Sequence, residues 1–302
     1  MATELRARKI YLEDVEKVYD GRRVLDNIDL SVSAGEFCSL VGPSGCGKST
    51  LLRLILGQEQ PTRGRVLIED QLVAFPDPRR GIVFQKYSLY PHLTVLDNVL
   101  LGKRLSHAPW WLPWPKHRDW RDEAMYYLEA VRLQDAIQRY PHELSGGMQQ
   151  RVAIAQALIM KPPALLMDEP FGALDPDTRE DLQLFLLDLW EKEKLTIFFV
   201  THDLEEACFL GSRLLVLSQY YTDDRGDGPE VNRGGKIVAD YQLTQFGNST
   251  EVKRHAAFKD FIARVREEGF DPQIRQHVKD FNLKHPDSFQ TLTAEEYAAG
   301  DA

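Results

Sequence analysis

The sequence predicts an α/β fold with a mainly parallel sheet and helices on both of its faces. Short apolar runs, typical of buried strands, alternate with longer segments of helical period. Closely spaced strand-like runs near the start, joined by a turn signal at Asp20-Gly21, predict an additional small antiparallel β layer. The helical period of residues 94–160 predicts a helical subdomain.

The individual elements follow from the same patterns. Strands are expected at residues 10–12, 15–19, 28–32, 36–41, 65–68, 82–84, 165–167 and 196–200. Helices are expected at residues 51–56 and 174–194, and a turn at residues 61–64.

Two units are expected: a main domain over residues 1–245 and a C-terminal extension over residues 246–302. The extension is charged and helical, and one apolar stripe could dock it on another surface. Packing on its own chain is the simpler explanation of that stripe. Its members are Phe258, Phe261, Ile262 and Val265.

Two insertions interrupt the main domain, at residues 104–120 and 219–235. The first has three prolines, which exclude a regular helix. It holds four of the five tryptophans, at positions 110, 111, 114 and 120, and these suit a membrane boundary, a partner surface or packing on the domain itself. In the second, Asp223, Asp227 and Gly228 resemble part of a calcium loop, but Arg225 and Gly234 occupy ligand positions and argue against calcium.

Composition excludes several classes of protein. The chain has 302 residues, 43% of them hydrophobic, and a net charge of −9, which argues against a nucleic-acid binder. No apolar run is long enough to span a bilayer, and residues 1–9 lack the apolar core of a secretory signal. Three cysteines without metal-ligand spacing, Cys38, Cys46 and Cys208, are expected to be reduced cytosolic thiols.

A glycine-rich stretch between a predicted strand and a predicted helix matches the phosphate-binding P-loop pattern G-x-x-x-x-G-K-[ST]. Its glycines let the backbone approach a polyphosphate, and the loop amides and the helix N-terminus face the phosphates. Lysine supplies a positive charge for the terminal phosphates, and the following serine can ligate Mg²⁺. The nine residues are Gly42, Pro43, Ser44, Gly45, Cys46, Gly47, Lys48, Ser49 and Thr50.

Polar residues that could act on a bound nucleotide follow two other predicted strands. Asp168 ends the run at residues 165–167 and is the candidate Mg²⁺-organising carboxylate, expected beside the P-loop strand. Glu169 projects differently and is the candidate general base for the attacking water. His202 follows the run at residues 196–200 and could contact the γ-phosphate while holding the water and Glu169 in line.

A second anion-binding helix end is predicted at Ser145, Gly146 and Gly147, where the serine can cap a helix with bare amides. One nucleotide cannot use this helix end and the P-loop in the same place. A second copy of the chain resolves the conflict if each copy covers the nucleotide of the other.

The ordered set of these motifs resembles the ATPase subunit of ABC transporters over roughly residues 8–240. The set comprises the P-loop, Gln85 after an apolar strand, LSGGMQQR at 144–151, LLMDEP at 165–170, Ala173-Leu174-Asp175 and His202. One departure is Met148, where many members of the family have glutamine. The stretches YPHLTVLDNV at 90–99, YPHELSGGM at 140–148 and GALDPDTRE at 172–180 look closest to the nitrate/sulfonate/taurine importers.

The resemblance implies a P-loop NTPase (RecA-like) core and a head-to-tail dimer that sandwiches two ATP molecules. It implies Tyr19 as the aromatic that stacks on adenine. Gln85 is implied as a contact to Mg²⁺ and water, linked through the stretch from Tyr87 to Thr94 to transmembrane permease subunits. Ala173-Leu174-Asp175 is implied as a loop that crosses the dimer interface.

The sequence is therefore expected to encode an ATPase on the cytoplasmic face of the cell membrane that powers import of a small anion. A solute-binding protein is a further partner in such systems. The alternatives are the ATPase of an exporter or lipid-trafficking system, a soluble non-transport ABC ATPase, and a regulatory protein with a vestigial site.

Overall fold

A seven-stranded sheet of order β13-β11-β9-β3-β8-β7-β6 forms the centre of the molecule. The computed structural model of the chain describes residues 7–77, 80–85, 89–107, 118–225, 231–243 and 256–291, with the backbone alone at 106, 107 and 118. Five strands are mutually parallel: β3 (Phe37–Val41), β6 (Ile82–Phe84), β7 (Leu165–Asp168), β8 (Ile197–Val200) and β9 (Arg213–Ser218). Strand β11 (Lys236–Gln242) is antiparallel to β9, and β13 (Asn282–Leu283) is parallel to β11. The predicted mainly parallel sheet is confirmed.

The neighbours of the P-loop strand differ from the prediction. Strand β7, with Asp168 at its end, was expected beside β3, but β8 lies between them and pairs with both. The order of strands in a sheet is set by the crossover connections, which carry no signal within the strands themselves. The expectation that β7 adjoins the P-loop strand is therefore wrong.

The four-stranded antiparallel layer has the order β2-β1-β4-β5 and confirms the predicted β layer. Its strands are β1 (Arg8–Tyr19), β2 (Arg22–Ser33), β4 (Arg63–Ile68) and β5 (Gln71–Leu72). Asp20 and Gly21 both have positive φ and form the predicted turn between β1 and β2.

Two local expectations in this layer are wrong. The runs at residues 10–12 and 15–19 belong to one strand, with an irregularity between them at Asp14, whose φ is 50°. Gly64 lies in β4 rather than in the turn. Its φ is 80°, and a Cβ there would lie 2.1 Å from the Asp14 carbonyl oxygen, so the irregularity requires glycine opposite it.

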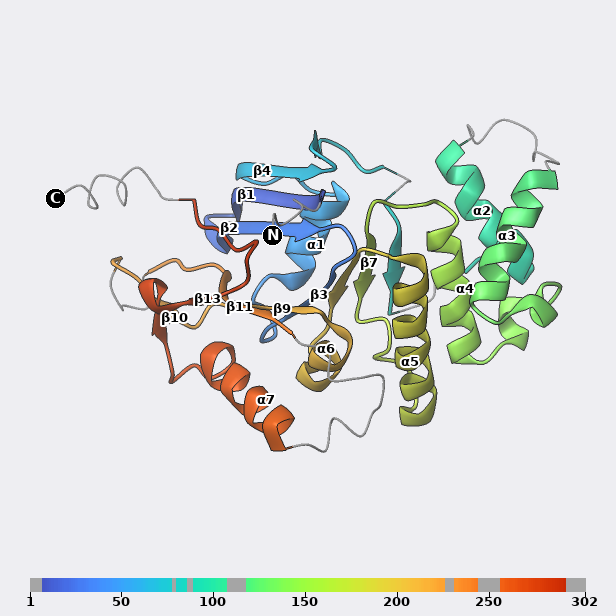
Figure 1. Cartoon of the computed structure of the whole chain (residues 1–302). Coiled ribbons are helices and arrows are strands. Elements are labelled where there is room, and N and C mark those ends of the chain that lie inside the picture. The colour runs from blue at the N-terminus through green and yellow to red at the C-terminus, as the bar shows by residue number, and fades with distance from the viewer. Residues whose placement is uncertain are drawn as a thin grey trace, which may run out of the picture.

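Helix α1 (Lys48–Leu56) packs between the antiparallel layer and one face of the central sheet (Figure 1). Its buried leucines meet Leu12 and Ile28 of the antiparallel layer and Leu40 and Val200 of the central sheet. This apolar contact fixes the helix whose N-terminus is the end of the P-loop.

The opposite face of the sheet carries the predicted helical subdomain, at the right of Figure 1. It contains α2 (Val95–His107), α3 (Arg118–Ala130), α4 (Gly146–Leu158) and the 3-10 turns η1 (Gln134–Ala136) and η2 (Pro141–Glu143). Helix α5 (Pro176–Glu193) packs beside it. Helix α5 starts later than predicted, because the Asp175 side chain accepts a hydrogen bond from Thr178 N–H and caps it.

The irregular insertion predicted at residues 104–120 is wrong at both ends. Helix α2 continues through His107 and α3 already begins at Arg118, so helix reaches up to the proline-containing stretch on each side. Trp120 is partly buried against the apolar core of the helical subdomain. The other three tryptophans of the stretch lie outside the described residues.

The apolar stripe of the C-terminal extension packs on its own chain, in agreement with the simpler explanation of this stripe. Helix α6 (Leu204–Leu210) and helix α7 (Ala256–Gly269) cover the edge of the sheet near β9 and β11. Phe258, Ile262 and Val265 of the apolar stripe are buried against Val216 and Val238.

Residues 270–291, which follow α7, contain no α-helix, contrary to the expected helical extension. The short elements β12 (Gln276–His277), η4 (Val278–Asp280) and β13 follow one another there. Strand β12 pairs with β10 (Tyr221–Thr222), which precedes α7 in the chain, and β13 pairs with β11. Residues 285–291 then run along β2: the Ser33 hydroxyl donates to Asp287, Thr291 N–H donates to Asp29, and Phe289 stacks on Tyr11 at 5.2 Å. These contacts to β1 and β2 hold the segment in place. They join residues distant in sequence, so a helical period in the sequence could not predict them.

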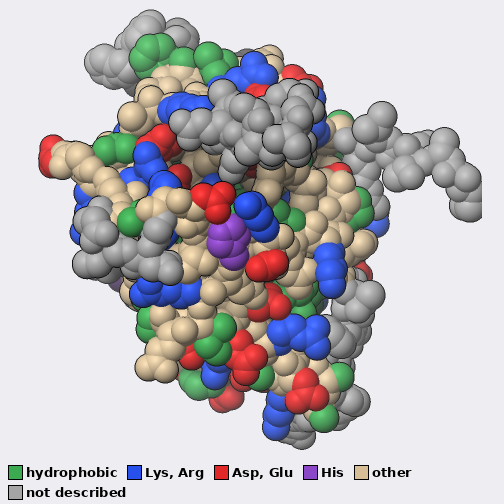
Figure 2. Space-filling view, turned by 90° about the vertical axis from the view of Figure 1, so that its left-hand side faces the viewer, with side chains coloured by type: hydrophobic (Ala, Val, Ile, Leu, Met, Phe, Trp, Pro, Cys, Tyr) green, Lys and Arg blue, Asp and Glu red, His purple; other side chains and the backbone are tan. Residues whose placement is uncertain are grey.

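Acidic and basic side chains are interspersed on the face where the C-terminal segments lie (Figure 2). In the segment after β10, Asp223 accepts hydrogen bonds from Arg225 Nε at 2.9 Å and from Arg233 Nη2 at 3.0 Å. Each carboxylate oxygen of Asp223 therefore forms an ion pair with an arginine. Within the described part of the chain, no helix is both long and apolar enough to cross a membrane.

Candidate active site

The carboxyl ends of four parallel strands line up in one row. Leu40 of β3 pairs with Val200 of β8, Val200 with Asp168 of β7, and Asp168 with Phe84 of β6. The residues just beyond this row include the P-loop, His202, Glu169 and Gln85. The carboxyl edge of such a sheet is where α/β proteins bind their ligands, so the structure brings these four predicted features to one edge.

The P-loop adopts a conformation that its glycines make possible. Gly47 caps α1 with a φ of 107°, in the left-handed region. A Cβ on Gly42 would lie 2.0 Å from the carbonyl oxygen of Leu217, so no larger residue fits there. Lys48 Nζ donates to the carbonyl oxygens of Gly42 at 2.7 Å and Pro43 at 3.0 Å, which holds the ammonium inside the loop.

Asp168 is a partly buried carboxylate close to the P-loop lysine. Burial and the neighbouring charge of Glu169 raise the pKa of Asp168, while Lys48 acts in the opposite direction. A carboxylate in this environment gains from an additional cation beside it.

Glu169 turns away from the strand that precedes it. Its φ of 46° lies in the left-handed region, uncommon for a residue with a side chain, and its N–H donates to Val200 O at 2.8 Å. This turn aims the side chain at the neighbouring loop, where His202 Nδ1 lies 3.1 Å from Glu169 Oε1. The two candidate catalytic side chains are thus in contact across β7 and β8.

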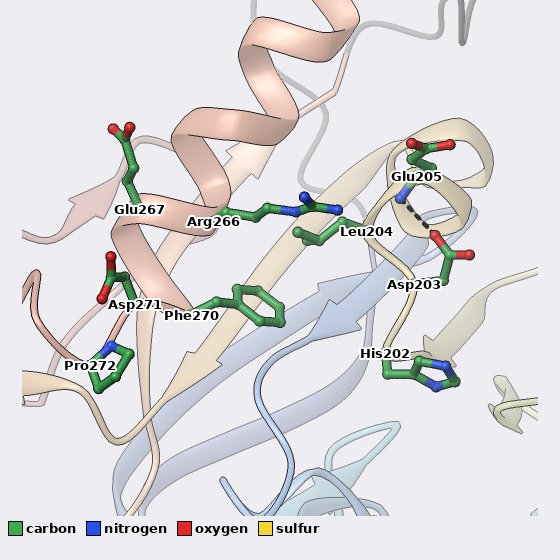
Figure 3. A pocket seen from close by; sticks show the side chains of 9 residues that line it. All are labelled: His202, Asp203, Leu204, Glu205, Arg266, Glu267, Phe270, Asp271 and Pro272. Atoms are coloured by element: carbon green, nitrogen blue, oxygen red, sulfur yellow. Dashed lines mark hydrogen bonds between the residues drawn. The ribbon is translucent and has the colours of Figure 1, made fainter.

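His202 also borders an open pocket of about 810 Å³. The opposite wall comes from the end of α7, where Arg266 and Phe270 extend toward Leu204 (Figure 3). The His202 ring points away from α7, and 65% of its side chain is exposed. The pocket therefore lies behind the histidine, on the side away from Glu169.

Gln85 lies beside the loop that follows Glu169. A Cβ on Gly172 would come within 2.7 Å of Gln85 Nε2, so glycine permits this close approach. Residues 86–88, with Tyr87, lie outside the described residues. The loop beyond them is fixed by the buried Asn98, whose side chain bonds backbone groups of Tyr90, Leu93 and Thr94.

Tyr19, the predicted adenine contact, stands at the end of β1. Its hydroxyl donates to Glu59, and Lys17 Nζ lies 4.9 Å from the ring centre. Glu59 also contacts Lys17 at 3.2 Å and Arg53 at 3.3 Å. Sequence reasoning missed Glu59, since no local pattern marks a carboxylate that is 40 residues away from the tyrosine it holds.

The second helix end, which is predicted to bind an anion, has the predicted cap. Ser145 Oγ accepts from Met148 N–H at 3.3 Å, and Gly146 and Gly147 open α4. A Cβ on Gly147 would lie 2.5 Å from Thr178 of α5, so the helix end needs glycine to pack there. In Figure 1, α4 and α1 lie apart, with β7 and α5 between them, so the two helix ends predicted to bind anions are separate within one copy.

The donor set near the P-loop fits a magnesium ion. Ser49 offers a hydroxyl, Asp168 a carboxylate and Gln85 a carboxamide oxygen, all hard oxygen ligands of the kind Mg²⁺ prefers. The raised pKa of Asp168 reflects a partly buried charge next to Glu169 that such a cation would relieve.

The fold and this site define a P-loop ATPase. Residues 25–172 match the family described as ABC transporter. The nitrate import ATP-binding protein NrtD of Synechocystis sp. is 46% identical over 211 residues, covering 68% of this chain and 77% of that protein. The aliphatic sulfonates import ATP-binding protein SsuB of Bacillus subtilis is 46% identical over 210 residues, covering 69% and 78%.

Solved structures agree with these relatives. An ATP-binding cassette of an ABC transporter in its ADP conformation has a TM-score of 0.67 and 26% identity, over 85% of this chain and 98% of that one. A dimeric bacterial ABC transporter cassette has a TM-score of 0.61 and 33% identity, over 78% and 100%. The chain therefore belongs to the ATP-binding proteins of ABC transporters, and it is an ATPase that binds ATP.

Proposed function

We propose that this chain powers the import of a small anion, such as nitrate, a sulfonate or taurine, through a membrane permease. The contact between Glu169 and His202 supports the catalytic part of the proposal. Both residues follow strands that share the carboxyl edge of the sheet with the P-loop strand. The import direction and the anion class rest on NrtD and SsuB, which are named for nitrate and aliphatic sulfonates.

The roles of the site residues follow from their chemistry. Lys48 and the loop amides neutralise the phosphates, and Glu169 orients and deprotonates the attacking water. His202 contacts the γ-phosphate and, through its 3.1 Å approach, keeps Glu169 directed at that water. Tyr19 stacks on adenine, and its bond to Glu59 limits the orientations of the ring.

Ser49, Asp168 and Gln85 are the residues that we propose hold Mg²⁺. A magnesium ion held there would supply positive charge to shield the phosphate oxygens. We infer that Gln85 also senses the permease, because it lies beside Gly172 and the chain leads from it to the loop at residues 89–94 that Asn98 fixes.

Two copies of the chain form a head-to-tail dimer in this proposal. The separation of the Ser145 helix end from the P-loop within one copy supports it, since each end can then face the nucleotide of the other copy. ATP binding closes the dimer and hydrolysis reopens it, a shift between two states that moves the permease. The complex lies on the cytoplasmic face of the cell membrane and works with a solute-binding protein.

The alternative function is an ATPase of an exporter or lipid-trafficking system, which would use the same site. Some soluble ABC ATPases of other kinds carry a long coiled coil between P-loop and signature, and none is evident between residues 50 and 144 of this sequence. Partner identity separates import from export.

The test is affinity purification of the tagged chain from its native membranes, followed by identification of the proteins that accompany it. A permease together with a solute-binding protein supports import, and the binding protein can then be titrated with nitrate, sulfonates and taurine. A permease alone or with lipid-handling proteins supports the alternative. Only soluble partners would overturn the transport function while leaving the ATPase chemistry intact.

Uptake in cells that carry Glu169→Gln gives the functional control. This variant should assemble with the same membrane partners yet abolish uptake of the anion. Undiminished uptake would mean that this chain does not power the transporter.

A further inference from the structure

A buried carboxylate lies directly behind the loop of His202. Glu206, in helix α6, is 6% exposed. Its Oε2 accepts a hydrogen bond from Thr201 Oγ1 at 2.6 Å, and its Oε1 accepts one from Gln183 Nε2 at 2.9 Å. The carboxylate thus joins the residue before His202 to helix α5.

The Thr201 hydroxyl also connects the residues on either side of His202, Thr201 and Asp203, to each other. While it donates to Glu206, it accepts from Asp203 N–H at 3.1 Å. The Asp203 carboxylate in turn accepts from the N–H groups of Glu205 and Glu206 at the start of α6, the first of which is drawn in Figure 3. The backbone on either side of His202 is therefore held, while its side chain extends outward to Glu169.

Helix α5 connects Glu206 to the second anion-binding end. Gln183, which is 2% exposed, lies in the middle of this helix. Thr178, in its first turn, packs against Gly147 of α4, and Asp175 precedes the helix in the loop expected to cross a dimer interface. A shift of α5 would reach the His202 loop through the Gln183–Glu206 hydrogen bond.

If this position only had to be filled, a carboxylate would be energetically unfavourable there. Burial of a charged group without full compensation is unfavourable, and burial raises the pKa of Glu206. Charge-assisted hydrogen bonds from two donors offset that cost and impose a defined geometry. An apolar side chain would fill the space without holding the loop.

We propose that Glu206 is a positioning residue for ATP hydrolysis, which holds the His202 loop in its working geometry and links it to helix α5. The inference rests on the proposed role of His202. Glu206 and Thr201 act through that histidine, without contact to the nucleotide.

The test is steady-state ATP hydrolysis by Thr201→Val, which removes the hydroxyl that donates to Glu206, and by Glu206→Gln, which replaces the charged acceptor with a neutral amide; both change the volume little. We expect kcat to fall about 10- to 100-fold, the worth of one hydrogen bond to a charged group, with the KM for ATP unchanged. Thr201→Ser restores the hydroxyl and should restore kcat. Glu205→Gln, on the exposed side of the same helix, is the matched control and should behave as the parent.

A His202→Ala background distinguishes positioning from a general loss of structure. If Glu206 acts through His202, then Glu206→Gln and Thr201→Val cause no further loss of kcat in that background. A full additional loss there, or a normal kcat for both single variants, would overturn the inference. If His202→Ala itself hydrolyses ATP normally, the proposed catalytic role of His202 fails. Should Glu206→Gln not fold, the Thr201→Val and Thr201→Ser pair decides the question.

Discussion

Arg213 should be among the most sensitive positions for stability, although it lies outside the hydrolysis site. Its guanidinium is 1% exposed and donates to both carboxylate oxygens of Asp240, at 2.8 and 2.6 Å, and to the carbonyl oxygen of Ser31 at 2.6 Å. The same group lies 3.3 Å from Glu36. The carboxylates of Asp240 and Glu36 are 3% and 7% exposed, so water cannot replace the arginine.

Arg213→Met keeps a long unbranched side chain but removes every donor. It takes the arginine away from two buried carboxylates, of which Glu36 keeps a contact to His285 Nε2 at 3.4 Å, and breaking a buried pair in this way costs about 3–5 kcal/mol. Urea unfolding followed by circular dichroism measures the loss. At an m value of about 3 kcal/mol/M, the midpoint should fall by about 1 to 1.7 M.

The pH dependence of this loss tests its cause. Burial raises the pKa of Glu36 and Arg213 lowers it, so without the arginine the folded-state pKa of Glu36 rises further above its unfolded value and the folded variant binds more protons. Protonation restores stability, and the difference from the parent should shrink as the pH falls from 7 toward 5. A loss below about 1 kcal/mol, or one that does not depend on pH, would refute the reasoning. Arg213→Lys, which keeps the charge but not the planar fork, should lose less.

Three further predictions concern the site. Glu169→Gln should bind ATP with nearly parental affinity and hydrolyse it at least about 100-fold more slowly; normal turnover in a phosphate-release assay would remove Glu169 from the mechanism. Because burial and Glu169 raise the pKa of Asp168, its protonation on acidification should weaken Mg²⁺-dependent ATP binding at a higher pH than for an ordinary aspartate, and titrations with and without Mg²⁺ should then converge. Asp168→Asn should abolish that pH dependence, and its persistence would assign it to another group. Cys46 is 1% exposed with a pKa raised by burial, so iodoacetamide should label it slowly in the folded protein, and the labelled fraction should not bind ATP; Cys46→Ser is the control, and ATP binding by labelled protein would contradict the expectation.

Much of the site could be predicted because its signals are local. The P-loop needs glycines, lysine and serine within nine consecutive residues, and the cap of α4 needs Ser145 directly before two glycines. The same segments show the order strand, loop, helix. This order predicts that the site lies at the carboxyl edge of the parallel sheet. Proline likewise marked the stretch between α2 and α3, although helix reaches closer to it than expected.

The sequence by itself determined the phosphate cradle, the parallel sheet and the antiparallel layer, because residue type and short-range periodicity encode them. Only the tertiary structure decided that β8 separates β7 from β3, and that a turn at Glu169 brings its carboxylate to His202. It also decided that Arg213 forms buried ion pairs with Glu36 and Asp240, and that residues 285–291 pack along β2. These contacts join residues from distant parts of the chain, and the gain in pairing buried polar groups with one another appears only after the sheet has brought them together.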